Sequence, residues 1–70
     1  MITRSQELMK GLLMNCGLSN EEASIETLFL ETHENNLKML DWLESRNFQA
    51  TKDEISSQVG QIIKESLGRV

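Results

Sequence analysis

Signals that begin a helix recur along this chain, and they restrict it to short helical segments. In a capping box, Ser or Thr at the helix start is followed three residues later by Glu or Gln, and each side chain binds the other residue's backbone N–H. Such pairs are Thr3 with Gln6, Ser19 with Glu22, and Thr51 with Glu54. The chain has no proline and no Asn-Gly or Asp-Gly pair of the kind that forms tight hairpins. We therefore expect an all-α protein.

Apolar residues at helical spacing locate the helices between these signals. The clearest stripe lies in the last segment and consists of Ile55, Val59, Ile62, Ile63 and Leu67. Near the N-terminus, Gly17 can adopt the left-handed conformation that ends a helix. We predict a compact array of three to four short helices at residues 4–16, 19–31, 33–46 and 51–67, packed as a single domain over residues 1–70.

The segment 31–36 is the main ambiguity, since its sequence Glu-Thr-His-Glu-Asn-Asn contains no apolar residue. Either Thr32 caps a new helix, or one helix continues to Arg46 with a length of about 40 Å at 1.5 Å per residue. We favour a break, because asparagines such as Asn35 and Asn36 prefer caps and turns to helix interiors.

Two further positions carry local predictions. Gly60 lies inside the last helix, where glycine costs about 1 kcal/mol relative to alanine. We therefore expect that it marks a bend or the close approach of a neighbour such as Trp42. Phe48 lies in the loop before the last helix, and we expect its ring to tuck back against the core.

Charge and composition exclude several classes of function. The 70 residues carry a net charge of -4, which repels phosphate backbones and anionic lipid. No apolar run approaches the length of a membrane span, and the single cysteine, Cys16, cannot close an intrachain disulfide. We expect a cytoplasmic protein without membrane contact, for which nucleic acid is an unfavourable partner.

Residues suited to catalysis or metal binding are sparse. His33 is the only imidazole, Cys16 falls on an apolar stripe, and the glycines form no phosphate-binding loop. Glu31, His33 and Glu34 are possible metal ligands, but they fall within one turn, and no further ligand joins them from elsewhere in the chain. We expect a protein that is not an enzyme and that holds neither a cofactor nor a metal.

Two stretches resemble known domain families. Residues 39–60 combine a hydrophobic helix around Trp42 with the segment Thr51-x-x-Glu54 and a later Gly60. They resemble two helices of winged-helix and helix-turn-helix regulators, which implies DNA binding as an alternative function. Residues 12–43 resemble the ubiquitin-associated domain, a three-helix fold that binds ubiquitin through a Met-Gly-Phe loop and its last helix. Residues 16–18, Cys-Gly-Leu, stand in the place of that loop.

Over most of its length, the chain also resembles small bacterial and phage proteins of unknown function. The shared features are a Gly-Leu-Ser-x-Glu-Glu-Ala hairpin, here residues 17–23, and an Ala-Thr-x-x-Glu-Ile segment, here residues 50–55. This resemblance implies four helices and carries no activity with it.

An excess of large apolar residues suggests a contact surface. Hydrophobic residues make up 39% of the sequence, which is generous for the inner faces of a small helical protein. We predict a non-enzymatic protein-interaction or regulatory module that binds an unidentified protein through Met14, Leu30, Met39 and Trp42. In the alternative interpretation, these side chains fill the core or join two copies of the chain. We expect a homodimer, with Trp42 or Leu30 near its contact.

Overall fold

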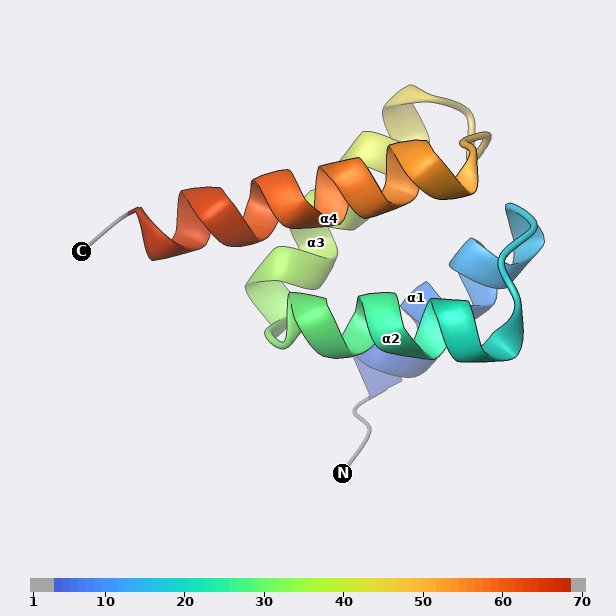
Figure 1. Cartoon of the computed structure of the whole chain (residues 1–70), viewed down its shortest axis with the longest axis horizontal. Helices are drawn as coiled ribbons and strands as arrows, with labels where there is room; N and C mark the ends of the chain where they lie inside the picture. Colours follow the sequence, from blue (N-terminus) through green and yellow to red (C-terminus); the bar gives the residue numbers. More distant parts are fainter. Residues whose placement is uncertain (1–3, 69–70) are drawn as a thin grey trace.

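Four helices and no strand make up residues 4–68, the part of the chain that this computed structural model describes. The helices are α1 (Arg4–Asn15), α2 (Asn20–Leu30), α3 (His33–Ser45) and α4 (Lys52–Leu67), as Figure 1 shows. The predicted all-α array is confirmed, and so is the break between the second and third helices. The capping box expected at Thr3 and Gln6 falls outside the described residues, because Thr3 precedes them.

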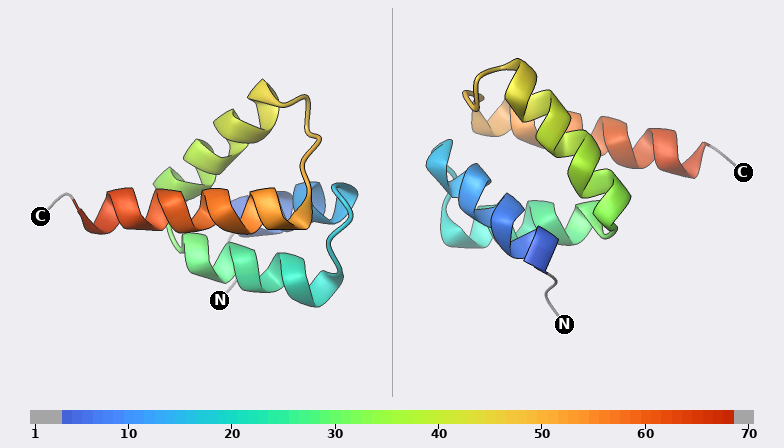
Figure 2. Two further views of the ribbon diagram at one scale, coloured as in Figure 1. Left: turned by 45° about the horizontal axis from the view of Figure 1, so that its top comes forward. Right: turned by 180° about the vertical axis from the view of Figure 1, so that it is seen from behind.

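The helices form two layers. In Figure 1, α2 and α4 run side by side in the near layer while α1 and α3 lie behind them, and the rear view in Figure 2 brings α1 and α3 to the front. Helices α1 and α4 each pack against both α2 and α3. The radius of gyration is 11.1 Å, the value of about 11 Å expected for a compact chain of this length. One apolar cluster joins the four helices: Met9, Leu13, Leu18, Ala23, Leu30, Met39, Leu43, Ile55, Val59 and Ile62.

The end of α1 follows the expected glycine cap. Gly17 has a φ of 108° and donates its N–H to the Met14 carbonyl at 3.0 Å. Leu18 N–H donates to the Leu13 carbonyl at 3.3 Å, which completes a Schellman motif. The motif satisfies the last carbonyls of α1 and turns the Leu18 side chain into the core.

The starts of α2 and α4 follow the two remaining capping boxes. Ser19 and Glu22 exchange side-chain and backbone hydrogen bonds at the start of α2, and Thr51 and Glu54 do the same at the start of α4. Each box satisfies two backbone N–H groups that a helix start otherwise leaves without acceptors.

The joint between α2 and α3 is a three-residue turn centred on Glu31. Glu31 has a φ of 64°, and Thr32 N–H donates to the Leu30 carbonyl at 2.7 Å, which closes a γ-turn. The Thr32 hydroxyl then accepts the Asn35 N–H at 3.1 Å and caps α3. The Asn35 and Asn36 amides donate to the carbonyls of Leu30 and Thr32, at 2.9 and 2.8 Å. The two asparagines therefore lie in the first helical turn of α3, not in the γ-turn, and stabilise the break between the helices from there.

The close approach expected at Gly60 and the tucked ring expected at Phe48 are both wrong. No group outside the neighbouring backbone of α4 lies within 4 Å of the position that a Cβ on Gly60 would occupy. Phe48 is 44% exposed, because Asn47 and Phe48 both adopt positive φ, 56° and 58°. This conformation directs the Phe48 N–H to the Leu43 carbonyl at 2.8 Å and leaves the ring at the surface.

Candidate protein-interaction surface

Two of the four predicted surface residues belong to the core. Leu30 and Met39 are both fully buried, so the prediction that they form a contact surface is wrong. The tight turn at Glu31 redirects the chain, and both α2 and α3 pack mainly against α1 and α4, which directs both side chains toward the centre. For the same reason, Leu30 cannot lie at the contact of a homodimer.

The other two predicted residues, Met14 and Trp42, lie on different helices, α1 and α3. Trp42 is half-buried, and the Arg46 guanidinium lies over its ring at 5.0 Å from the ring centre, a cation–π contact. Arg46 also pairs with Glu54 of α4, so part of the Trp42 ring is covered from within the protein. Met14 is 42% exposed on α1, and it lines neither the groove between α2 and α4 nor the groove between α1 and α3. The four residues thus do not form one surface.

The exposed apolar residues of α2 were missed by the sequence prediction. Ile25, Leu28 and Phe29 are 51%, 63% and 57% exposed. The inner face of α2 is instead formed by Ala23, Glu26, Thr27 and Leu30, which occupy positions i, i+3, i+4 and i+7 of one helical face. That inner face carries two polar residues while the outer face carries three large apolar ones. The sequence offers one signal of this inversion, Glu26 at the spacing of the inner face, but this signal alone does not show which face of α2 is buried.

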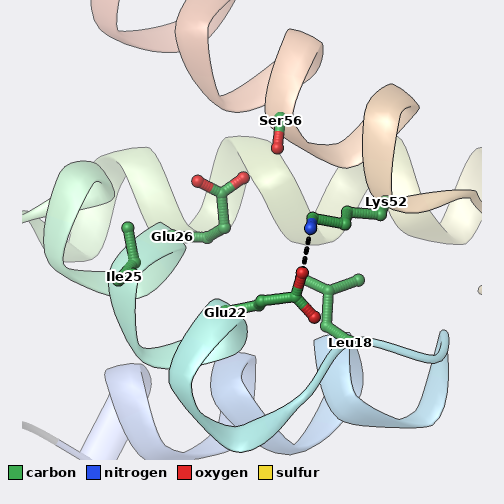
Figure 3. Close-up of a pocket in the computed structure, with 6 residues that line it drawn as sticks. All are labelled: Leu18, Glu22, Ile25, Glu26, Lys52 and Ser56. Atoms are coloured by element: carbon green, nitrogen blue, oxygen red, sulfur yellow. Dashed lines mark ion pairs between the residues drawn. The ribbon is translucent and has the colours of Figure 1, made fainter.

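A groove runs between α2 and α4 in the near layer of the molecule. Its first hollow, of about 210 Å³, is lined by Leu18, Glu22, Ile25, Glu26, Lys52 and Ser56 (Figure 3). Its second hollow, of about 500 Å³, is lined by Glu26, Phe29, Ser56, Val59, Gly60 and Ile63. Since Glu26 and Ser56 line both hollows, the two are parts of one α2–α4 groove, with Glu26 in its middle.

Glu26 is the polar centre of the α2–α4 groove. Its side chain is only 8% exposed, yet its Oε2 atom accepts no hydrogen bond within the structure. Figure 3 shows the carboxylate pointing from α2 toward α4, beside Ile25 and Ser56. A buried carboxylate without a donor is unfavourable, because burial removes the water that solvates its charge. The groove therefore holds a strong acceptor that the described residues do not satisfy.

One ion pair closes the end of the groove nearest the start of both helices. Lys52 pairs with Glu22, as the dashed line in Figure 3 indicates. The hydrogen bond from Lys52, followed by those from Ser19, lowers the pKa of Glu22 to about 2. The hydrogen bond to Glu22 in turn raises the pKa of Lys52. Lys52 thus binds Glu22 and not Glu26, and the groove lining keeps an excess of negative charge.

A second groove, the α1–α3 groove, lies in the far layer. It encloses about 120 Å³ and has mostly apolar walls, formed by Leu8, Leu12, Leu37 and Leu40. Asn36 lines it as well, and the Asn36 Oδ1 atom is buried without a hydrogen-bond donor. This groove therefore combines exposed leucines with one unsatisfied neutral acceptor.

At the rim of the α1–α3 groove, Ser5 Oγ lies 2.6 Å from His33 Nδ1. A serine beside a histidine is the first requirement for nucleophilic catalysis, but the histidine must also be oriented by a third group. No described residue forms a hydrogen bond with the other ring nitrogen of His33. The pair is therefore a surface hydrogen bond that joins α1 to α3.

The remaining candidate residues are not assembled into sites. Cys16 is half-buried and donates its thiol to the Phe48 carbonyl at 3.3 Å. Within residues 4–68, no group of three His, Cys, Asp or Glu side chains is arranged to hold a metal ion. In the same range, no helix combines the length and the apolar character needed to cross a membrane.

Comparison with known proteins yields no relative: no family model, no curated protein sequence and no solved structure matches this chain.

Proposed function

We propose that this protein is a non-enzymatic protein-binding module whose docking surface is the α2–α4 groove. The observation that carries the proposal is the inversion of α2, which exposes Ile25 and Phe29 beside the groove while a carboxylate is buried inside it. Exposed apolar side chains one helical turn apart are typical of surfaces that bind another protein. A chain that needed only to fold would gain stability from the reverse arrangement.

A site-specific photo-crosslinking experiment tests the proposal. A photoreactive phenylalanine analogue replaces Phe29 in one variant and Phe48 in a matched one, since both rings are exposed but only Phe29 lines the groove. In an extract of the native host, we expect the analogue at position 29 to form one discrete adduct with another protein. The analogue at position 48 should form none. Equal adducts from the two positions would contradict the proposal.

Self-association is the competing proposal, and its contact surface would be the α1–α3 groove in the other layer of the molecule. Leu8 is 66% exposed and Leu37 is 47% exposed in the α1–α3 groove, whose acceptor is neutral. A homodimer that paired this surface with itself would meet no strong charge repulsion. Sedimentation tests it: a species of twice 8.0 kDa that dissociates in a Leu8→Glu variant supports the dimer, and a single 8.0 kDa species refutes it.

DNA binding is the second alternative, taken from the helix-turn-helix likeness of residues 39–60. Helix α4 continues through Gly60 to Leu67, so no separate helix begins where a recognition helix would be expected. The net charge of -4 also opposes phosphate contacts. An unchanged mobility of duplex DNA at about 50 mM salt, where phosphate contacts are strong, would exclude this alternative.

A further inference from the structure

We propose that the partner of the α2–α4 groove is a basic amphipathic helix of another protein, one of whose Lys or Arg side chains enters the groove and binds Glu26. This inference rests on the proposed function and adds the chemistry of the partner to it.

The carboxylate of Glu26 defines what must enter the groove. Its Oε2 atom is buried, accepts no hydrogen bond from the described residues and lies where the two hollows meet. The only basic side chain among the lining residues is Lys52, and it pairs with Glu22. A ligand that enters the groove can supply the donor that Glu26 Oε2 lacks. A cationic donor is favoured, because hydrogen bonds between charged groups are about twice as strong as neutral ones.

The surrounding charge selects the same partner. Helix α2 carries Glu21, Glu22 and Glu26 and no basic residue. A basic segment would be attracted to this helix before contact and oriented on it. A second copy of the chain, docked through the same face, would place one acidic α2 near another. Nucleic acid would meet the same repulsion.

The size of the first hollow, which Glu26 lines, suits a side chain better than a metabolite. The first hollow, about 210 Å³, is smaller than the about 300 Å³ at which small-molecule pockets begin. The second hollow, about 500 Å³, continues from it and has apolar walls formed by Phe29, Val59 and Ile63. One long cationic side chain suits the first hollow, and apolar side chains of the same ligand suit the second.

The secondary structure of the groove favours a helical ligand. Both walls are helices, and an amphipathic helix can lay its apolar side chains into the space between two helices. An extended peptide usually gains its affinity by pairing with the edge of a sheet, and residues 4–68 contain no strand. The ligand expected here carries apolar residues at helical spacing and a Lys or Arg beside them.

Selection from a displayed library of random peptides tests this inference without presupposing a partner. The native protein is the bait, and the affinity of the selected peptides is then measured by calorimetry. We expect these peptides to combine Lys or Arg with apolar residues at helical spacing. Replacing the basic residue in the peptide by Gln should weaken binding at least about tenfold, because it leaves a buried charge without its partner.

Two variants of α2 with the same change of charge separate a specific contact from general attraction. Glu26→Gln removes the buried carboxylate, whereas Glu21→Gln removes an exposed one from the same helix. We expect Glu26→Gln to weaken binding at least about tenfold and Glu21→Gln to change it less than about twofold. The helical circular-dichroism signal and the urea midpoint of Glu26→Gln should be at least as high as those of the native protein. A loss of peptide binding in this variant would then not be caused by unfolding.

The outcomes distinguish this inference from the proposed function. If the selected peptides bind the native protein and Glu26→Gln equally but lose affinity for Phe29→Ala, the groove is a docking surface and the basic partner is wrong. If the peptides are indifferent to both Phe29→Ala and Glu26→Gln, or if none is selected, both the surface and its partner are wrong.

Discussion

The α2–α4 groove and the α1–α3 groove lie in opposite layers of the molecule, and each combines apolar walls with one buried oxygen that lacks a donor. In the first groove this oxygen belongs to the carboxylate of Glu26, and in the second to the amide of Asn36. An unsatisfied buried amide oxygen costs about 1–3 kcal/mol. An unpaired carboxylate costs more, because its charge loses solvation as well.

The difference separates two kinds of surface. A neutral acceptor in an apolar groove is compatible with a protein that remains alone, because an unsatisfied amide oxygen costs less than an unsatisfied carboxylate. A buried carboxylate is a larger loss of stability, and such losses concentrate at binding sites. The comparison therefore favours the α2–α4 groove over the α1–α3 groove as the proposed docking surface.

The comparison depends first on which side of α2 faces the core. Substitutions of two adjacent residues of α2 test this orientation, and they have the largest expected effect on stability. Leu30→Ala should lower the free energy of unfolding by about 2–5 kcal/mol, since Leu30 is fully buried. Phe29→Ala should change it by less than about 0.5 kcal/mol, since the Phe29 ring is 57% exposed. Urea unfolding followed by circular dichroism measures both. Similar losses at the two positions would show that α2 is turned the other way.

The two buried oxygens can then be compared directly. Glu26→Met replaces the carboxylate by an apolar side chain of similar size and should raise the free energy of unfolding by about 1–3 kcal/mol. Asn36→Leu removes an unsatisfied oxygen but also the amide that donates to Thr32, so these effects should cancel to within about 1 kcal/mol.

A clear loss of stability in Glu26→Met would contradict the comparison. It would show that the carboxylate has a favourable partner within the unbound protein. The Asn36→Leu variant is the control for the general effect of adding an apolar side chain beside a groove.

The fold was predictable because its signals are local. Gly17 and the boxes that begin at Ser19 and Thr51 lie within a few residues of the ends that they fix, so their effect does not depend on the rest of the chain. Thr32 marks the start of α3 in the same way, although its box lacks a Glu or Gln at Asn35.

The surface was not predictable by the same route, because it depends on which helix face meets a neighbour. Leu30 and Phe29 are both large apolar residues in the sequence, and only the packing of α2, chiefly against α1 and α4, makes one buried and the other exposed. The position of Glu26, three residues after Ala23 and four before Leu30, did indicate a buried acid. Only the structure shows whether this acid has a partner, since an acid on an inner face can also be paired within the core.

Two exposed glycines, Gly11 and Gly60, lie in helix interiors, and replacing them should have a smaller effect on the free energy of unfolding. No neighbouring group lies within 4 Å of a Cβ placed on Gly11 or Gly60. Gly11→Ala and Gly60→Ala should therefore each raise the free energy of unfolding by about 0.5–1 kcal/mol. Only Gly60 lines the α2–α4 groove, so only Gly60→Ala should alter the affinity for a selected peptide. Equal effects of both variants on binding would place the docking surface elsewhere.

The smallest expected effect is the acid sensitivity of the ion pair at the end of the α2–α4 groove. The bond from Lys52 holds the pKa of Glu22 at about 2, and the Thr51 N–H and hydroxyl, together with Arg46, lower the pKa of Glu54. Both pKa values are lower in the folded than in the unfolded protein, so the unfolded state binds more protons between about pH 5 and pH 2. Stability is therefore complete above this range and falls as the pH is lowered through it.

Urea midpoints measured from about pH 7 down to about pH 2 should decrease in the native protein. Glu22→Gln keeps an oxygen that can accept the Ser19 N–H but removes the charge that binds Lys52. We expect this variant to lose less stability on acidification, and Glu54→Gln to remove a separate part of the dependence. A Glu22→Gln profile parallel to that of the native protein would show that the pair does not persist in solution, and this end of the groove would then be open to a ligand.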